Sequence, residues 1–208
     1  MKKILFIILI SCFSLIIISC SEDKEESTTD TVSTTSQMGG SIQGAELSLS
    51  TVVTTLAGTV DNGSANGTGT SASFYYPFGI TTDGTNLYVA DSSNHLIRKI
   101  VISTGAVTTL AGTGSSGSAN GTGTSASFSN PSGITTDGTN LYVTTDNHLI
   151  RKIVISTGAV TTVAGTGSSG SANGTGTSAR FWNPQGITTD GTNLYVSDTS
   201  NHIIRKIE

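Results

Sequence analysis

The residues best suited to chemistry in this 208-residue sequence are three histidines that recur at a regular spacing. His95, His148 and His202 each follow an asparagine and precede leucine or isoleucine. Three imidazole groups can hold a zinc ion. Each histidine, however, begins an apolar run typical of a strand, and the asparagine before it is typical of a tight turn. We therefore predict that the histidines complete turns, and that the protein has no metal site and no cofactor.

The charged residues also recur in patterns that indicate structure rather than catalysis. Acids in Asp-Gly turns accept hydrogen bonds from nearby backbone N–H groups, and three occur here: Asp83, Asp137 and Asp190. Asp91 and Asp198 are expected to anchor the turns that follow them. Three basic pairs are expected to pair with these acids or to cover strand edges: Arg98-Lys99, Arg151-Lys152 and Arg205-Lys206. The sequence contains no Gly-x-Ser-x-Gly, phosphate loop, Cys-His pair or close carboxylate pair, so we predict that the protein is not an enzyme.

Three copies of one unit position these residues. Thr-Thr-Leu-Ala-Gly at 54–58 returns at 108–112, and Thr-Thr-Val-Ala-Gly follows at 161–165. The copies are 54 and 53 residues apart, because the second copy lacks one residue between Val143 and Asn147. Turn signals divide the first copy into four apolar segments, which predicts four antiparallel strands at 79–83, 86–90, 95–102 and 106–111. A long Gly- and Ser-rich loop leads to the next copy.

The third predicted strand of each copy is apolar on both faces. In the first copy, Leu96, Ile100 and Ile102 alternate with Ile97 and Val101. An antiparallel sheet with one face in water would alternate more cleanly between apolar and polar residues. A sheet that is apolar on both faces must lie between two others, as a propeller blade does. The sequence therefore predicts an all-β fold made of three four-stranded propeller blades.

Residues 77–100 resemble an NHL repeat. They read PFGITTDGTNLYVADSSNHLIRKI and include the literal Asn94-His95-Leu96. Residues 131–153 and 184–207 resemble the repeat equally well. NHL repeats fold as four-stranded propeller blades, so the resemblance implies the fold that the strand pattern predicts. The long loops also resemble those of bacterial NHL proteins, except that asparagine stands where aspartate is common: Asn66, Asn120 and Asn173.

Three blades alone do not form a closed ring. Closed propellers typically have four to eight blades, and neighbouring sheets in a three-blade ring would diverge by about 120°, far more than packed sheets do. Residues 50–57 have the sequence of a fourth strand without the first three, and 202–208 end the third copy after its third strand. We expect a homodimer in which each first strand completes the last blade of the other chain, giving a six-bladed ring. The alternative is a non-functional fragment of a longer propeller.

The positions at which the copies differ are the candidate ligand-binding site. They gather just before the first strand of each copy, so they should lie together at one face of the propeller. The corresponding sets are Tyr75, Tyr76 and Phe78; Ser129, Asn130 and Ser132; and Trp182, Asn183 and Gln185, with Arg180 replacing a serine nearby. Tyr, Trp and Arg are enriched at binding hot spots. We predict that the first and third sets and Arg180 bind the ligand; the alternative is that the aromatic side chains cover the blade ends.

The N-terminal residues have the pattern of a secretory signal peptide. A basic start at Met1–Lys3 precedes an apolar run shorter than the roughly 20 residues that span a membrane. Ile17-Ile18-Ser19-Cys20 then resembles the lipobox of bacterial lipoproteins. This resemblance implies a signal peptide over residues 1–19, cleavage before Cys20 and acylation of its sulfur; the alternative is an ordinary signal peptide cut elsewhere. Because serine rather than aspartate follows the cysteine, the outer membrane is favoured.

Composition divides the remainder of the chain and limits its partners. Residues 20–49 carry one basic residue, six acids and scattered apolar residues, which predicts a disordered tether before the propeller at 50–208. The whole sequence has a net charge of −4, so it lacks the basic field that nucleic-acid binding requires. We predict a lipid-anchored, extracytoplasmic module of the bacterial cell envelope that binds a protein or a polysaccharide. A lyase or hydrolase on the same scaffold is the alternative.

Overall fold

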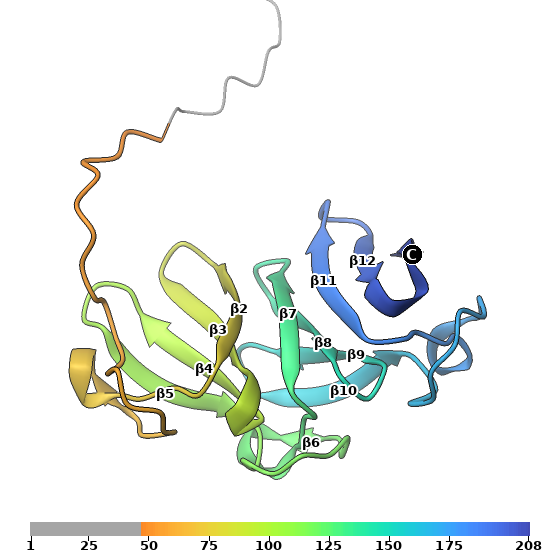
Figure 1. Ribbon diagram of the computed structural model, residues 1–208, viewed down its shortest axis with the longest axis horizontal. Helices are drawn as coiled ribbons and strands as arrows, with labels where there is room; N and C mark the ends of the chain where they lie inside the picture. Colours follow the sequence, from red (N-terminus) through yellow and green to blue (C-terminus); the bar gives the residue numbers. More distant parts are fainter. Residues whose placement is uncertain (1–46) are drawn as a thin grey trace, which may run out of the picture. The chain divides into compact units, whose positions relative to one another are not determined.

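Three antiparallel sheets make up the protein in a computed structural model, which describes residues 47–208 (Figure 1). The predicted signal peptide, Cys20 and most of the predicted tether lie outside the described residues. Residues 47–49 are exposed and belong to no strand. None of the helices between residues 47 and 208 has the length and apolar character needed to cross a bilayer.

Each sheet is one blade. The first contains β2 (Pro77–Thr82), β3 (Asn86–Asp91), β4 (Leu96–Val101) and β5 (Ala106–Ala111). The second contains β7 (Pro131–Thr136), β8 (Asn140–Thr145), β9 (Leu149–Val154) and β10 (Ala159–Ala164). The third contains β11 (Pro184–Thr189), β12 (Leu194–Asp198) and β13 (Ile203–Ile207). The predicted all-β class and the order of strands within each blade are confirmed.

The long loops contain more structure than the sequence indicates. Short strands β1 (Gly67–Thr68) and β6 (Gly121–Thr122) pair with β5 and β10, so the first two sheets have five strands. Each loop also contains one 3-10 turn: η1 (Gly69–Ser71), η3 (Gly123–Ser125) and η4 (Gly176–Ser178). Two further 3-10 turns precede histidines: η2 (Ser92–Asn94) and η5 (Thr199–Asn201). The loops are therefore built onto the blades as outer edges.

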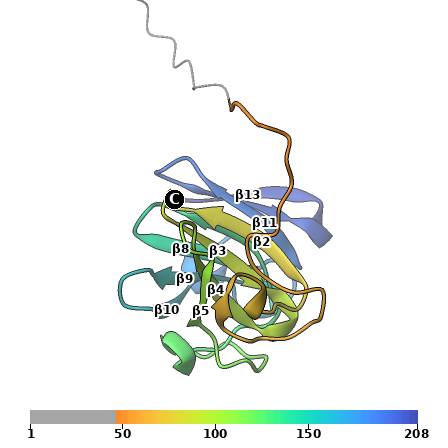
Figure 2. The same ribbon diagram turned by 90° about the vertical axis from the view of Figure 1, so that its left-hand side faces the viewer.

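Five strand limits of the first blade differ by one or two residues from those expected, and one expected strand is not formed. The inner strand of the first blade begins at Pro77, two residues early, and β4 begins at Leu96 because His95 adopts a left-handed φ of 55°. Residues 50–57, predicted as a fourth strand, lie in no strand and are drawn as an orange coil without an arrow (Figure 2). Their predicted pairing partner is the last blade of a second chain. Within the described residues, the outermost strand of that blade, β13, pairs only with β12.

The hydrophobic core lies between blades rather than within one sheet. Tyr88, Ala90 and Ile97 of the first blade pack against a set of buried residues from the second blade that includes Phe128 and Leu141. A second cluster joins the second and third blades in the same way. The inner strand β7 contacts both β2 and β11, and these three strands follow one another across Figure 1. The prediction that each blade needs neighbours on both faces is confirmed for the middle blade.

Candidate ligand-binding site

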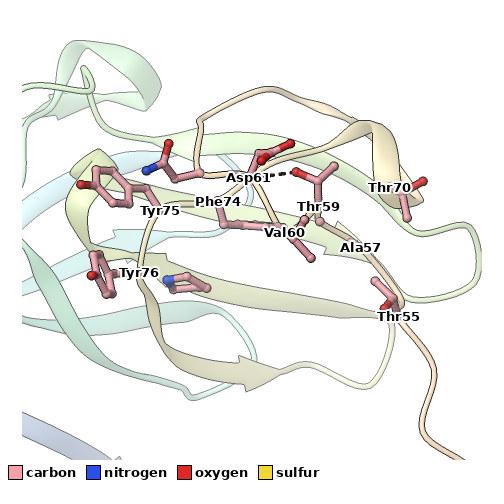
Figure 3. A pocket seen from close by; sticks show the side chains of 12 residues that line it. Thr55, Ala57, Thr59, Val60, Asp61, Thr70, Phe74, Tyr75 and Tyr76 are labelled. Atoms are coloured by element: carbon pink, nitrogen blue, oxygen red, sulfur yellow. Dashed lines mark hydrogen bonds between the residues drawn. The ribbon is translucent and has the colours of Figure 1, made fainter.

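An open groove of about 840 Å³ lies between residues 55–62 and the start of the first blade (Figure 3). Tyr75 and Tyr76 form one wall, with their ring centroids 5.3 Å apart and their planes at 29°. Thr59, Asp61 and Asn62 contribute hydroxyl, carboxylate and amide groups to the lining. The groove therefore combines an aromatic surface with several hydrogen-bonding groups.

The two tyrosines are held by backbone contacts. The backbone N–H of Tyr75 donates to Oδ1 of Asp91 at 2.7 Å, and its carbonyl oxygen accepts from the N–H of Ser93 at 3.0 Å. Tyr76 adopts a left-handed φ of 51°. The corresponding residues in the other blades are Asn130 and Asn183, a residue type that tolerates this region far better than a bulky aromatic. Tyr76 is therefore the bulky, strained counterpart of two asparagines.

A buried arginine positions the long loop beneath the groove. One guanidinium nitrogen of Arg98 donates to the Oδ2 atom of Asp91 at 2.8 Å and to the Ser73 carbonyl at 3.1 Å. The other donates to the Ala65 carbonyl at 3.0 Å and to Oδ1 of Asn66 at 2.9 Å. The expected pairing of the arginines with acids is thus confirmed for Arg98, and for Arg205 with Asp198 at 3.0 Å. The loop asparagine acts as a neutral acceptor for this buried cation.

The groove collects residues that distinguish the first blade from the other two. Its lining includes Val60, Asp61 and Asn62, where the second copy has Gly114-Ser115-Ser116. Sequence analysis did not single out this triplet, although the comparison of copies that identified Tyr75 and Tyr76 also reveals it. Two separate segments that differ between the copies therefore lie on one surface.

The predicted binding residues form two groups rather than one. Tyr75 and Tyr76 line the groove, whereas Phe78 lines an adjacent groove together with Leu56 and Ile80. The third-blade group lines neither groove. Arg180 and Trp182 are exposed, and Asn183 and Gln185 are half-buried. The structure thus places the two groups at equivalent ends of different blades.

Two of the three histidines form hydrogen bonds between neighbouring blades. Nδ1 of His95 accepts from the backbone N–H of Asn130 at 3.1 Å, and Nδ1 of His148 accepts from that of Asn183 at 3.2 Å. The prediction that these histidines satisfy turns is confirmed, with the turn lying on the neighbouring blade. Among residues 47–208, no group of three or more His, Cys, Asp or Glu side chains could hold a metal ion.

The Asp-Gly turns have the expected structural role. The carboxylate of Asp83 accepts from the side chain and backbone N–H of Asn86, and these hydrogen bonds lower its pKa well below the usual range. Burial and the hydrogen bond to Asp83 raise the pKa of Tyr88 to about 12. Each of these carboxylates accepts several hydrogen bonds from its own hairpin, so these acids are poorly suited to proton transfer.

Comparisons with known proteins bear on the fold and on binding. No family model matches the chain. NHL repeat-containing protein 2 of Homo sapiens is 39% identical over 101 residues, which cover 46% of this chain and 14% of that protein. Protein SUPPRESSOR OF QUENCHING 1, chloroplastic, of Arabidopsis thaliana is 33% identical over 152 residues, which cover 66% of this chain and 14% of that protein.

A solved structure shows the same relationship. The crystal structure of an auxiliary nutrient binding protein from Bacteroides thetaiotaomicron VPI-5482 is 26% identical, with a TM-score of 0.57 over 63% of this chain and 37% of that one. This chain therefore spans only a small part of the curated relatives and about a third of this structure.

Proposed function

We propose, from the homology of this chain to NHL repeat-containing proteins and its propeller blades, that it is a binding module for an extracytoplasmic polysaccharide. A lipid on Cys20 would hold the module at the bacterial envelope, with the outer membrane favoured. The structural neighbour named as a nutrient binding protein supports a binding role on this scaffold.

The exposed tyrosine pair is the observation that carries this proposal. A sugar ring has apolar C–H faces that stack on aromatic rings and hydroxyl groups that need hydrogen-bond partners at its edge. Tyr75 and Tyr76 supply the stacking surface. Thr59, Asp61 and Asn62 supply acceptors and donors along the same groove. The groove is open, which suits an extended polymer better than an enclosed small molecule.

The same groove argues against hydrolysis of the polymer. Glycoside hydrolases generally place two carboxyl groups on either side of the scissile bond. Asp61 is the single acid among the residues that line this groove. We therefore propose binding without cleavage, rather than a lyase or hydrolase activity.

A protein ligand is the second candidate, and it rests on the third blade. Arg180 and Trp182 are both exposed there, and these residue types often dominate protein interfaces. This group lies outside the groove of the first blade, so the two candidates can be separated by mutation.

The proposed function is tested by titrating the full chain with soluble envelope and plant polysaccharides in a calorimeter. The double variant Tyr75→Ser/Tyr76→Ser should weaken binding at least about 30-fold, since base–aromatic stacking, a comparable contact, contributes about 1–3 kcal/mol per ring. Trp182→Ser is the matched control and should bind polysaccharide like the parent. Loss of binding in the control alone would place the polysaccharide on the third blade and refute the groove as its site. A large drop in thermal stability of the double variant would instead mean that the tyrosines cover the end of the blade.

Anchoring is tested separately by fractionating cells that express the full chain or its Cys20→Ser variant. The parent should sediment with membranes and show mass added at Cys20. The variant should show no added mass at residue 20, because serine lacks the thiol that takes up the acyl group. A parent chain without added mass at Cys20 would exclude the proposed anchor while leaving polysaccharide binding open.

A further inference from the structure

We propose that a second copy of this chain completes the propeller, with residues 52–57 of each copy adding as the fourth strand to β13 of the other. The proposed seam shares Thr55, Ala57 and Tyr76 with the polysaccharide groove, but the proposal does not depend on polysaccharide binding. It rests on five observations about the first and third blades.

Residues 51–58 already have the turns of a fourth strand at both ends. Thr51 adopts a left-handed φ of 59°, matching 67° for Gly105, the turn residue before β5. Gly58 has a φ of 104°, matching 114° for Gly112 after β5. The N–H of Gly58 donates to the Gly69 carbonyl at 3.1 Å, as that of Gly112 does to the Gly123 carbonyl. The segment is therefore held against the first blade as β5 is held against the second.

The edge strand that would receive this segment is free within the described chain. β13 pairs only with β12, whereas β4 and β9 each have a partner on both sides. In the first blade, Ile97 pairs with Ala111, Arg98 with Thr109 and Ile100 with Val107. The repeat alignment transfers this register to three pairs between copies: Ile204 with Ala57, Arg205 with Thr55, and Ile207 with Val53.

Apolar side chains at these two ends are exposed, although their counterparts are buried. Val53 is 95% exposed, while Val107 and Val160 are 2% exposed. Ile204 on β13 is 73% exposed, while its counterparts Ile97 and Ile150 are fully buried. On the opposite side, Ile80 of β2 is 60% exposed, against 6% for Ile134. The first blade thus presents half of an inter-blade core, and the third blade presents the other half.

Polar groups at the two ends also complement each other. His95 and His148 each accept a hydrogen bond from the left-handed residue of the next blade. His202 is the third such histidine, and it is exposed. The left-handed residue of the first blade is Tyr76, so its N–H in a second copy is the expected donor to His202.

The inner strands leave room for the same approach. A side chain at Gly133 would collide with the carbonyl oxygen of Gln185 on the next blade, so the two backbones are in close contact. Gly186 is the corresponding residue of the third blade, and the nearest atoms around it belong to its own neighbour Ser197. A second copy would place the carbonyl of Phe78 beside Gly186, in the same arrangement.

The number of blades selects a dimer. Two copies give six blades, within the four to eight of closed propellers, whereas one copy gives three and three copies give nine. The two seams of the dimer are identical by symmetry, so no edge strand is left open. The occupant of the apolar groove of about 420 Å³ beside Ile80 is therefore the third blade of the second copy.

Closure would leave the polar side of the polysaccharide groove accessible. Thr113, Ser115 and Ser116 of the second blade correspond to this side, and they remain exposed although the first blade packs beside them. Phe128 and Pro131, the counterparts of Phe74 and Pro77, are buried, so the apolar side of the groove would become part of the seam. Ile204 does not line the groove, so Ile204→Arg separates loss of dimerisation from loss of polysaccharide binding.

The test is sedimentation equilibrium of the full chain in detergent, from nanomolar to micromolar concentration. We expect twice the protein mass of one chain, which is 21.2 kDa for all 208 residues and smaller after cleavage before Cys20. Ile204→Arg should raise the dissociation constant at least about 100-fold, because it places a charge in the closed seam. Thr161→Arg is the control, since Thr161 is exposed on β10 of the middle blade, whose two neighbours belong to the same chain, and it should leave the dimer intact. Because Ile204 is exposed in the single chain, its variant should still fold.

Cysteine cross-linking tests the register. A Val53→Cys chain mixed with an Ile207→Cys chain, both with Cys12 and Cys20 replaced by serine, should form a disulfide-linked pair on mild oxidation. Leu49→Cys in place of Val53→Cys should not, because Leu49 precedes the pairing segment. A monomer at all concentrations, or a dimer that Ile204→Arg does not weaken, would overturn the proposal. A larger open polymer would also overturn it, since ring closure by two copies would then be wrong.

Discussion

Replacing Thr145 by aspartate should stabilise the second blade, because this blade buries an arginine without a carboxylate partner. Arg151 is fully buried, as Arg98 is, and its guanidinium donates to the Ser127 and Ala119 carbonyls and to Asn120 Oδ1, each at 3.0 Å. The residue that corresponds to Asp91 is Thr145. Burial lowers the pKa of Arg151, as expected for a cation without a neighbouring anion.

The magnitude follows from the bonds gained and lost. An aspartate at 145 would add one charged hydrogen bond to Arg151, which contributes about 1.5–3 kcal/mol, and one to the backbone N–H of Ser129, which contributes about 1 kcal/mol. It would remove the hydrogen bonds of the Thr145 hydroxyl to Asn147 Oδ1 at 2.6 Å and to the Leu149 carbonyl at 3.1 Å. These two neutral bonds contribute about 2 kcal/mol together. The net gain should be about 0.5–2 kcal/mol.

Thermal unfolding measured by circular dichroism at one fixed protein concentration checks this prediction. A gain of about 0.5–2 kcal/mol should raise Tm by roughly 1–8 °C in a domain of this size. Thr145→Asn is the control, because it has the shape of aspartate without the charge. Equal or lower Tm for the aspartate variant than for the asparagine variant would refute the claim that Arg151 lacks electrostatic compensation.

Three further variants test other parts of the fold. Although burial raises the pKa of Asp137, hydrogen bonds from its own turn lower it to about 2. The carboxylate should therefore stabilise the fold above about pH 4 and lose this effect as pH falls towards 2. Asp137→Asn should make the free energy of unfolding, measured by denaturant titration, less dependent on pH between about 4 and 2. Gly133→Ala should cost about 1–3 kcal/mol or more, because the added methyl meets the Gln185 carbonyl, and chemical denaturation would measure it. Phe128→Ala should cost about 3–5 kcal/mol, since this fully buried ring fills the seam between blades and lies 5.3 Å from the Arg151 guanidinium.

The blade architecture could be predicted from the sequence because it depends on local signals. The Asp-Gly turns predict antiparallel hairpins, and the apolar residues on both faces of the third strand predict that each sheet has neighbours. The hairpin of β3 and β4, residues 86–101, follows this pattern. The short strands inside the long loops could not be predicted, because Gly67 pairs with Val107 in a loop whose Ala65 carbonyl is bound by the buried Arg98. Such pairings depend on tertiary contacts that composition does not encode.

The candidate site was predicted only in part, for a similar reason. Comparison of the copies identified Tyr75 and Tyr76, but these residues and Asp61 are separated by a loop whose path is set by the buried arginine. The arginines were expected to pair with acids or cover edges. Their second role, holding the loop through an asparagine and two carbonyls, requires knowing that the guanidinium is fully enclosed.

One carboxylate links the buried arginine to the exposed aromatic residue in the first and third blades. Oδ2 of Asp91 accepts from Arg98 while Oδ1 accepts from the backbone of Tyr75, and Asp198 holds Arg205 and the backbone of Trp182 in the same way. In the second blade the acid is absent, and a serine stands where the other blades have an aromatic residue. Because the aromatic residues occur only where this anchor exists, their rigid backbone placement is part of the surface that they form. A binding surface built from preorganised rings loses less conformational entropy when it captures its ligand.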